Sequence, residues 1–481
     1  MDEGFLQLCT KERFNHEFDL YKATKTDTLK EKPFINIQMG ADGINYQVFE
    51  QNLEHHIDSI IKRLKRGNYF FYPFRELIKS KDPAITSPYK ALKLGKERIL
   101  SIASIRDVLV QKVLYDFLYP CLEDEFNSLP LVSFGYRKNL NAPKAARMVY
   151  SHLQDGYCYV VDGDIKKFFD QIPHDLLSQE LKKYLGDSHL IYQLLNRFLH
   201  VDRIEWITYR NKTYKFKKER PKRTKRQSGI PQGGILSGLI ANLYLHQFDQ
   251  WVINDLGKDL PIRYVRYADD FIILSKNKDK LAEIKIKCTT FLDSIGLELH
   301  SNPEKTRLID LSQKGNFVNF VGFAISETGI RIKAQNMNKF KDRIRKILSS
   351  TKLDTLNSLK VLKLKIDYKF SGNEVKKRVC KTCGKFEIRK NWLNFFLTIT
   401  DVQQLRSLDS WVTKEIHKKY FFDTNHRLTR ASLNKLNFPS LEKLYYFYRK
   451  QQSETDSICS CSPIEAEYEN TQNPYYELFK Y

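Results

Sequence analysis

Residues 262–274 read IRYVRYADDFIIL, and this pattern predicts two short strands joined by a tight turn. Apolar residues flank Asp269-Asp270 on both sides, so both strands should be buried and the two acids should lie at the rim of a core. An Asp-Asp pair is often no more than a turn. The buried flanks favour the other interpretation, in which a rigid hairpin holds two adjacent carboxylates for chemistry.

A second acidic cluster, VDGDI at 161–165, ends the expected buried strand YCYVVD at 157–162. With Asp164 on a neighbouring strand, three carboxylates would face one another. Like charges that close destabilise a protein unless a cation lies between them. Mg²⁺, with Mn²⁺ as a substitute, is the natural occupant because hard cations prefer carboxylate and phosphate oxygens. Two such ions can activate an attacking hydroxyl and stabilise a leaving pyrophosphate.

The charge of the chain points to nucleic acid as its partner. Lys and Arg total 80 against 57 Asp and Glu, which gives a net charge of +23. Basic surfaces attract polyanions because neutralised phosphates release condensed counterions. No apolar run approaches the roughly 20 residues that cross a bilayer, and the N-terminal residues are too polar for a signal peptide. We therefore expect a soluble cytoplasmic protein without membrane contact.

The order of patterns along the 481 residues predicts an α+β fold with a helical appendage. A chain of this length exceeds one compact core and suggests two or three sub-domains. Helical spacing is expected at 48–67, 105–120, 235–251 and 281–297, and strand-like patterns at 98–102, 157–162, 262–274 and 317–333. The chain is helical and basic from about residue 337, and the polar, acidic end from about 452 is typical of a flexible tail.

Tyr267-Ala268-Asp269-Asp270 resembles the YxDD box of reverse transcriptases. Further blocks of that family occur in the expected order within residues 35–330. They are ADGI at 41–44, SIRDVLVQ at 104–111, SFGYR at 133–137, DIKKFFD at 164–170, GIPQGGILS at 229–237, GLEL at 296–299 with EKTR at 304–307, and FVNFVGF at 317–323. The upstream blocks are similar to those of bacterial group II intron-type enzymes.

The resemblance implies a right-hand polymerase, an enzyme that copies an RNA template into cDNA from dNTPs. The domains it implies are an N-terminal extension at 1–34, fingers at 35–150, a palm with an antiparallel sheet at 151–335, a basic helical thumb at 336–450 and a flexible tail at 451–481.

The resemblance also assigns roles to single residues. It makes Asp164, Asp269 and Asp270 the catalytic acids and places the metal ions on these three and on Ile165. Phe169 takes the place of the steric gate that excludes a ribose 2′-hydroxyl, although a core aromatic is the alternative. The other residues implied to bind the nucleotide are Lys96, Arg98, Arg106, Gln232, Gly233, Gly234 and Lys305. Asp162 and Asp170 are expected to be structural.

The chain departs from the family at Ser237-Gly238, where Ser-Pro usually follows the PQG block. Glycine is looser than proline in the first turn of a helix. The departure leaves the predicted chemistry intact and argues against close kinship with standard intron enzymes.

Residues 210–226, RNKTYKFKKERPKRTKR, contain ten Lys or Arg and one acid. A run of charge can simply be a solvated surface. Its place between the first Asp block and the PQG block, with two aromatic residues interleaved, favours a loop that grips phosphates. The expected nucleic-acid contacts are Lys217, Lys218, Arg220, Lys222, Arg223, Lys225 and Arg226. The basic thumb, including 405–419, should track an RNA–DNA duplex by its shape.

Eight cysteines leave one metal question open. Cys380 and Cys383 have the spacing of half a zinc site, and Cys459 and Cys461 would be the other half. The second pair is spaced too closely for a usual knuckle, so free thiols are favoured over zinc. The other four cysteines are expected to be buried and reduced.

The sequence is compatible with several biological roles. No segment resembles an HNH endonuclease, an RNase H domain or an integrase, which favours a stand-alone bacterial enzyme of the defence-associated class. Such an enzyme would copy a dedicated non-coding RNA in antiviral (anti-phage) defence. The alternatives are an intron-derived enzyme or splicing cofactor without its endonuclease, and a template-independent or protein-primed polymerase using Tyr475, Tyr476 or Tyr481. A homo-oligomer or an accessory protein is left open.

Overall fold

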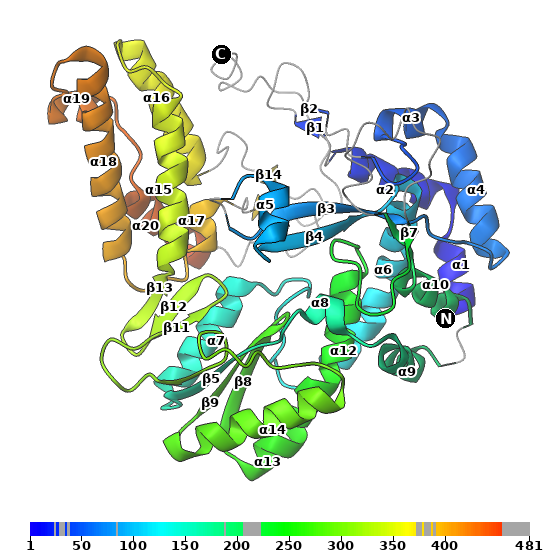
Figure 1. The fold of residues 1–481 in the computed structure, drawn as a ribbon. Coiled ribbons are helices and arrows are strands. Elements are labelled where there is room, and N and C mark those ends of the chain that lie inside the picture. Colours follow the sequence, from blue (N-terminus) through cyan, green and yellow to red (C-terminus); the bar gives the residue numbers. More distant parts are fainter. Residues whose placement is uncertain are drawn as a thin grey trace.

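The computed structural model describes residues 1–23, 26–27, 34–35, 39–82, 85–186, 189–204, 223–371, 378–379, 386–387 and 391–454. Figure 1 shows a central sheet low in the view, a helical block at upper left and a second group of helices with a sheet at right. None of the described helices is both long enough and apolar enough to span a bilayer.

The N-terminal part combines helices with a four-stranded sheet of order β4-β3-β6-β7. Its strands are β3 (Phe74–Ser80), β4 (Glu97–Ile102), β6 (Arg203–Ile204) and β7 (Arg223–Thr224). The helices are α1 (Asp2–Leu8), α2 (Lys11–Ala23), α3 (Tyr46–Gln51), α4 (Leu53–Lys65), α5 (Pro88–Lys93), α6 (Ile105–Phe126), α9 (His174–Leu185) and α10 (His189–Leu199). A short pair, β1 (Thr26–Asp27) and β2 (Phe34–Ile35), is also present.

The central sheet has the order β10-β5-β9-β8 and is antiparallel throughout. Its strands are β5 (Tyr159–Asp164), β8 (Ile262–Tyr267), β9 (Asp270–Ser275) and β10 (Arg307–Asp310). The helices α7 (Ala142–Gln154), α8 (Phe168–Gln171), α12 (Ser237–Trp251), α13 (Gly257–Asp259) and α14 (Leu281–Ser294) belong to this part, with a π-turn at Val252–Leu256 and a 3₁₀ turn at Lys278–Lys280.

Both faces of the central sheet are buried. Along β9, Phe271 and Ile273 join the core shared with α12 and α14, whereas Ile272 and Leu274 join the core shared with α7. Successive side chains of a strand point to opposite faces, so a continuous apolar run fills two cores at once. This explains why the run after Asp270 is apolar without alternation.

The C-terminal part joins a small sheet to helices. β11 (Val318–Phe320), β12 (Phe323–Ser326) and β13 (Gly329–Ile332) form an antiparallel sheet that contacts α7. The helical block at upper left in Figure 1 consists of α15 (Ala334–Ser349), α16 (Leu356–Ser371), α17 (Trp392–Phe395), α18 (Gln403–Thr424), α19 (Arg430–Lys435) and α20 (Leu441–Glu454). One more pair, β14 (Arg378–Val379) and β15 (Phe386–Glu387), lies between α16 and α17 in the chain.

The predicted α+β class, with antiparallel sheets and a helical C-terminal part, is confirmed. Two helix predictions were wrong in detail. The helix expected at 48–67 is two helices that meet at Asn52, and the helix expected to end at Pro120 runs on to Phe126. Proline removes one backbone hydrogen bond, but burial of Leu122 and Phe126 favours the continued helix. The domain boundaries stay predictions.

Candidate active site

The β8–β9 hairpin places the predicted acids side by side. Strand register pairs Asp164 on β5 with Asp270 on β9, and Tyr267 on β8 with the same Asp270. Directly opposed residues in an antiparallel pair have Cβ atoms roughly 4.5–5.5 Å apart. Asp269 lies in the turn between the strands, after Ala268 with a left-handed φ of 58°. The structure therefore brings all three predicted acids to one end of the central sheet.

A buried network holds the tip of this hairpin. Arg266 is fully buried and forms an ion pair with buried Asp249 of α12, with Nε 2.7 Å from Oδ1. Its Nη1 also donates to the carbonyl oxygen of Ala268 and to Oδ1 of Asn242, each at 3.0 Å. Asn242 in turn donates to the carbonyl oxygen of Gly135 at 2.6 Å. The turn is thus tied to helix α12 and to the SFGYR segment.

The carboxylates at the tip repel one another. Loss of solvent around the side chain, followed by the charges of Asp269, Asp164 and Asp162, raises the pKa of Asp270 to about 7, while Lys305 opposes the shift. The pKa of Asp269 is raised by the same loss of solvent and by Asp164, while Arg98 lowers it. Raised carboxylate pKa values at one point of the surface mark a site that favours added positive charge.

Two cationic side chains already form ion pairs with acids of this cluster. Lys305 donates from Nζ to Oδ2 of Asp164 at 2.9 Å, and Arg307 on β10 donates to Oδ2 of Asp162 at 2.6 Å across the strand pair. The first contact connects Lys305, which the resemblance predicts to bind the nucleotide, to one of the predicted catalytic acids. The second makes Asp162 a structural partner of Arg307, as the sequence predicted for that residue.

A divalent cation fits the donors at this tip. In the described parts of the chain, no three Asp, Glu, His or Cys side chains lie close enough together to form a ready-made cage. Mg²⁺ does not need one, because it commonly binds through one or two carboxylates together with substrate phosphates and waters. Asp164 and Asp270 lie opposite each other on neighbouring strands and supply two carboxylates. In this structure the carboxylate of Asp164 forms an ion pair with Lys305. The side chain of Ile165 is a hydrocarbon without a donor atom, so only its backbone carbonyl can serve as the predicted ligand.

The PQG segment borders the same region. The backbone N–H of Ser101 on β4 donates to the carbonyl oxygen of Gln232 at 2.6 Å. Gly233 has a φ of 103°, and a Cβ there would lie 3.1 Å from the carbonyl oxygen of Ser101. A Cβ at Gly234 would collide with Phe198. Glycines in this segment allow the close approach of β4 and α10.

Phe169 and Arg98 both have Tyr136 as a neighbour, and Arg98 also lies near Asp269. The ring of Phe169 packs edge-on against Phe168 and Tyr136. Arg98 is exposed on β4, and its charge acts on Asp269 and on Tyr136. Both positions suit the nucleotide roles predicted for them.

Lys96 and Arg106 have protein partners instead. Lys96 pairs with Asp82 at 3.0 Å. The guanidinium of Arg106 lies over the rings of Tyr69 and Tyr72 at 4.6 and 4.2 Å, and it pairs with buried Asp107 at 3.2 Å. These contacts give Arg106 a structural role in the fold, so its predicted contact with the triphosphate gains no support from its position.

The basic segment is described only at its end. Lys217, Lys218, Arg220 and Lys222 lie outside the described residues, whereas Arg223 and Lys225 are exposed at and after β7. Arg226 is buried, with a guanidinium nitrogen 3.4 Å from the hydroxyl of Ser101. The buried position of Arg226 gives no support to its predicted phosphate contact, which stays a prediction.

The structure tests only some of the cysteine predictions. The described residues do not include the four cysteines of the possible zinc site, Cys380, Cys383, Cys459 and Cys461. They also do not include the possible priming tyrosines, Tyr475, Tyr476 and Tyr481. Cys9 and Cys288 are buried free thiols as expected. Cys121 is an exposed free thiol and Cys158 is only partly buried, which corrects the expectation that both are buried.

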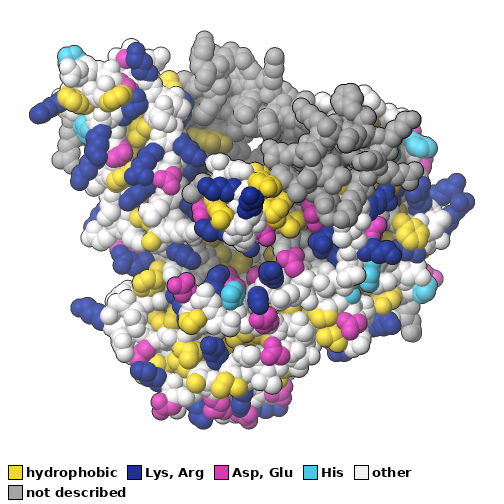
Figure 2. Space-filling view, in the orientation of Figure 1, with side chains coloured by type: hydrophobic (Ala, Val, Ile, Leu, Met, Phe, Trp, Pro, Cys, Tyr) yellow, Lys and Arg dark blue, Asp and Glu magenta, His cyan; other side chains and the backbone are white. Residues whose placement is uncertain are grey.

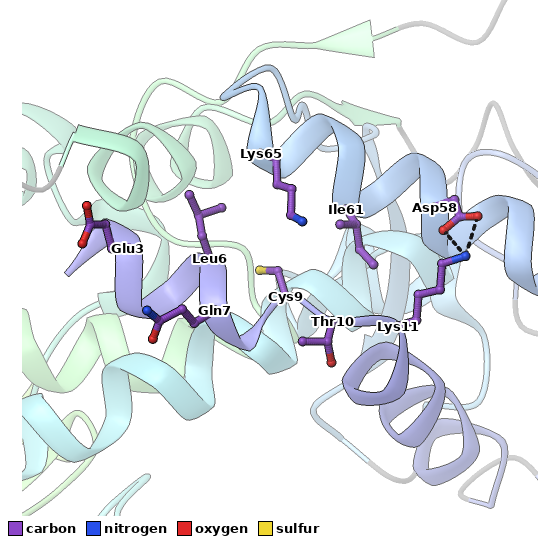
Figure 3. A pocket seen from close by; sticks show the side chains of 9 residues that line it. All are labelled: Glu3, Leu6, Gln7, Cys9, Thr10, Lys11, Asp58, Ile61 and Lys65. Carbon is purple, nitrogen blue, oxygen red and sulfur yellow. Dashed lines mark hydrogen bonds and ion pairs between the residues drawn. The ribbon is translucent and has the colours of Figure 1, made fainter.

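One hollow of the surface lies away from the predicted acids. A hollow of about 750 Å³ lies between α1, α2 and α4, where Lys11 pairs with Asp58 (Figure 3). It contains none of the predicted site residues. Figure 2 shows Lys and Arg side chains over the helical block at upper left. There Lys341 and Arg345 lie over the ring of Trp411 at 5.5 and 5.3 Å, so part of this charge is held by an aromatic partner.

Sequence reasoning missed the residues that hold the hairpin. Arg266 shares the inward face of β8 with Tyr264, so a charged residue at an inward position of a buried strand was the available signal. Its partner Asp249 is the one Asp, Glu, Lys or Arg residue of α12, which was a second available signal.

The family model described as "Reverse transcriptase (RNA-dependent DNA polymerase)" matches residues 79–325, just over half of the chain. The chain belongs to the reverse transcriptase family. This reverse transcriptase therefore carries an RNA-directed DNA polymerase domain, and the matched range includes the acids and the PQG segment.

Curated relatives agree with the assignment. The reverse transcriptase is 26% identical to Protein YkfC of Escherichia coli over 56% of this chain and 71% of that protein. It is 28% identical to the group II intron-encoded protein LtrA of Lactococcus lactis over 56% of this chain and 49% of that protein. The chain thus spans about half the length of LtrA. Apo telomerase from Candida tropicalis is similar with a TM-score of 0.38 and 17% identity over 60% of this chain and 61% of that chain, a likeness too loose to add to the assignment.

Proposed function

We propose that this protein synthesises cDNA on an RNA template by nucleotidyl transfer with two Mg²⁺ ions, and that Asp164, Asp269 and Asp270 hold them. The observation that carries the proposal is the register that sets Asp164 opposite Asp270, with Asp269 in the adjoining turn. The ions supply activation of the primer hydroxyl and stabilisation of the departing pyrophosphate.

Three side chains and the PQG segment would position the nucleotide and the template. Arg98 offers a guanidinium to the triphosphate, since Arg binds phosphate oxygens through two parallel hydrogen bonds. Lys305 neutralises negative charge beside Asp164, and this contact supports a role for its ammonium group toward the departing pyrophosphate. Phe169 bounds the sugar side of the nucleotide. The PQG segment supplies backbone atoms close to the template and the nucleotide.

The proposed partners are a dedicated non-coding RNA as template, dNTPs as substrates and a cDNA product. Basic side chains on α15 and α18, at the edge of the helical block, are suited to follow the phosphates of a duplex. We propose anti-phage defence as the biological role. Deleting the gene in its host should raise phage sensitivity, and unchanged sensitivity would remove that role without touching the enzymatic one.

The test compares the wild-type protein with Asp269→Asn and Asp270→Asn, and with Asp279→Asn as a surface control. Nucleic acid that copurifies from the host is sequenced, and primer extension on an RNA template is measured with Mg²⁺ or Mn²⁺. A cDNA made by the wild type and the control, but by neither active-site variant, supports the proposal.

A second function is favoured by one observation, the 28% identity to an intron-encoded protein. A splicing cofactor would bind the same RNA in the wild type and in the Asp variants, with no cDNA in either. That result would contradict the polymerase proposal. DNA covalently attached to a tyrosine would instead indicate a protein-primed enzyme.

A further inference from the structure

Tyr136 lies where the SFGYR segment contacts both the β8–β9 hairpin and the start of α12. It belongs to the SFGYR segment, has a left-handed φ of 57° and is about half exposed, at 48%. A positive φ is unfavourable for an aromatic residue, so the surrounding structure must hold it there. Its neighbour Gly135 is pressed against the catalytic hairpin, where an added Cβ would lie 2.5 Å from the backbone nitrogen of Ala268.

The ring of Tyr136 rests on Gly238. A Cβ at position 238 would lie 2.5 Å from Cδ1, 2.6 Å from Cγ and 3.1 Å from Cβ of Tyr136. Real Cβ atoms do not approach other atoms that closely, so neither proline nor alanine fits beside this ring. The departure from Ser-Pro at this position in the sequence is therefore matched by an aromatic ring in space.

The other side of the ring meets Phe169. The two ring centroids are 6.2 Å apart with an interplanar angle of 87°, an edge-to-face contact. Phe168 contacts Phe169 at 5.3 Å from within the core. The Phe169 ring is thus bounded by a core aromatic on one side and by a half-exposed tyrosine on the other.

The phenol of Tyr136 also lies within the electrostatic reach of the catalytic acids. Its pKa is raised first by burial and then by the charges of Asp269 and Tyr267, while Arg98 lowers it. The hydroxyl therefore stays protonated at neutral pH. Contact with Gly238 and Phe169, together with proximity to Asp269 and Arg98, places this ring at the wall of the nucleotide site.

We propose that Tyr136 is a positioning residue for sugar selection, which holds the Phe169 ring against the 2′ position of the incoming nucleotide and depends on Gly238 for the space its own ring occupies. This inference rests on the proposed polymerase function. It adds a second ring to the selecting wall, and it explains glycine at position 238 as the partner of that ring.

The test measures kcat/KM for a dNTP and for the matching rNTP in primer extension on RNA. The variants are Tyr136→Phe, Tyr136→Ala, Gly238→Ala, Phe169→Ala and the doubles Tyr136→Ala/Gly238→Ala and Tyr136→Ala/Phe169→Ala. Tyr446→Ala, which removes an exposed tyrosine on α20, is the control.

Tyr136→Phe and the control should keep the wild-type preference for dNTPs. Tyr136→Ala should lose at least about tenfold of it, with kcat for dNTPs within a few-fold of the wild type, as expected for a loss of steric exclusion. Gly238→Ala should resemble Tyr136→Ala, and the Tyr136→Ala/Gly238→Ala double should be no worse than Tyr136→Ala alone. The Tyr136→Ala/Phe169→Ala double should select no less than Phe169→Ala, because both act through one ring.

An active Tyr136→Ala enzyme whose preference stays within about twofold of the wild type would overturn the inference. So would losses that multiply in the double variant with Phe169. Failure of the proposed function has another signature, since the wild type then extends no primer with either nucleotide, and the inference falls with it.

Discussion

Nη1 of the buried Arg266 donates a hydrogen bond of 3.0 Å to the carbonyl oxygen of Ala268, the residue that turns the chain into the Asp pair. Arg266 is itself held by Asp249. The tip of the hairpin is therefore anchored by a buried ion pair, and the positions of the predicted catalytic acids depend on residues buried in the core.

Replacing Arg266 with Met should lower the free energy of unfolding by about 3–5 kcal/mol, because it leaves Asp249 buried without its charge partner. The double variant Arg266→Met/Asp249→Leu should recover most of this loss. Urea unfolding measures both. Arg331→Met is the control, since its ion pair with Asp401 is solvent-exposed and should contribute no more than about 1 kcal/mol. A single variant as stable as the control would show that the network does not anchor the hairpin.

The metal-free protein should lose stability as the pH rises, through Asp270. Its folded-state pKa of about 7 exceeds the reference value of 3.8, so the folded state binds the proton more tightly than the unfolded state does. The stability this proton provides is complete below the reference value and is lost as the pH rises through about 7. Asp270→Asn should escape that loss, by up to about 1 kcal/mol, because the Asp270 side chain is closely surrounded by protein but keeps a solvent-accessible surface that screens its charge. Urea unfolding in EDTA at several pH values checks this, and equal pH profiles for the two proteins would contradict it.

Lys305→Gln should bind Mn²⁺ about three- to tenfold more tightly in the absence of nucleotide, because it frees Asp164 from a competing ammonium. Its kcat should fall, since the cation that faces the leaving pyrophosphate is gone. Isothermal titration and steady-state kinetics measure the two effects. Lys166→Gln is the matched control, because Lys166 pairs with Glu298 at 2.9 Å and should leave the Mn²⁺ affinity unchanged. An unaltered affinity in Lys305→Gln would rule out the competition.

Arg98→Ala should raise the KM for dNTPs at least about tenfold, equivalent to about 1.4 kcal/mol, through loss of a phosphate contact. Arg98→Lys should recover part of it. Lys96→Ala should have a smaller effect, because Lys96 is engaged with Asp82. Primer-extension kinetics at varied dNTP concentration distinguish the two residues. A larger effect at Lys96 would reverse their assignment and restore the sequence prediction for that lysine.

Most of the site prediction rested on local sequence patterns. The apolar flanks of Asp269-Asp270 predicted a buried hairpin, and the register confirms that its tip meets Asp164. Such features depend on neighbours in the chain, whose spacing sets which side chains share a face. Burial depends on distant residues instead. Arg226 reads as one more cation in a basic run, yet its side chain is buried, with a guanidinium nitrogen 3.4 Å from the Ser101 hydroxyl.

The sequence by itself determined the α+β class, the family blocks and the three acids, because strand alternation and short motifs are properties of contiguous residues. Only the tertiary structure decided that Arg266 holds the hairpin through Asp249, that Lys305 pairs with Asp164, and that the ring of Tyr136 fills the space above Gly238. Burial and partner choice depend on which segments the fold packs together, and segments far apart in the chain carry no local record of that contact.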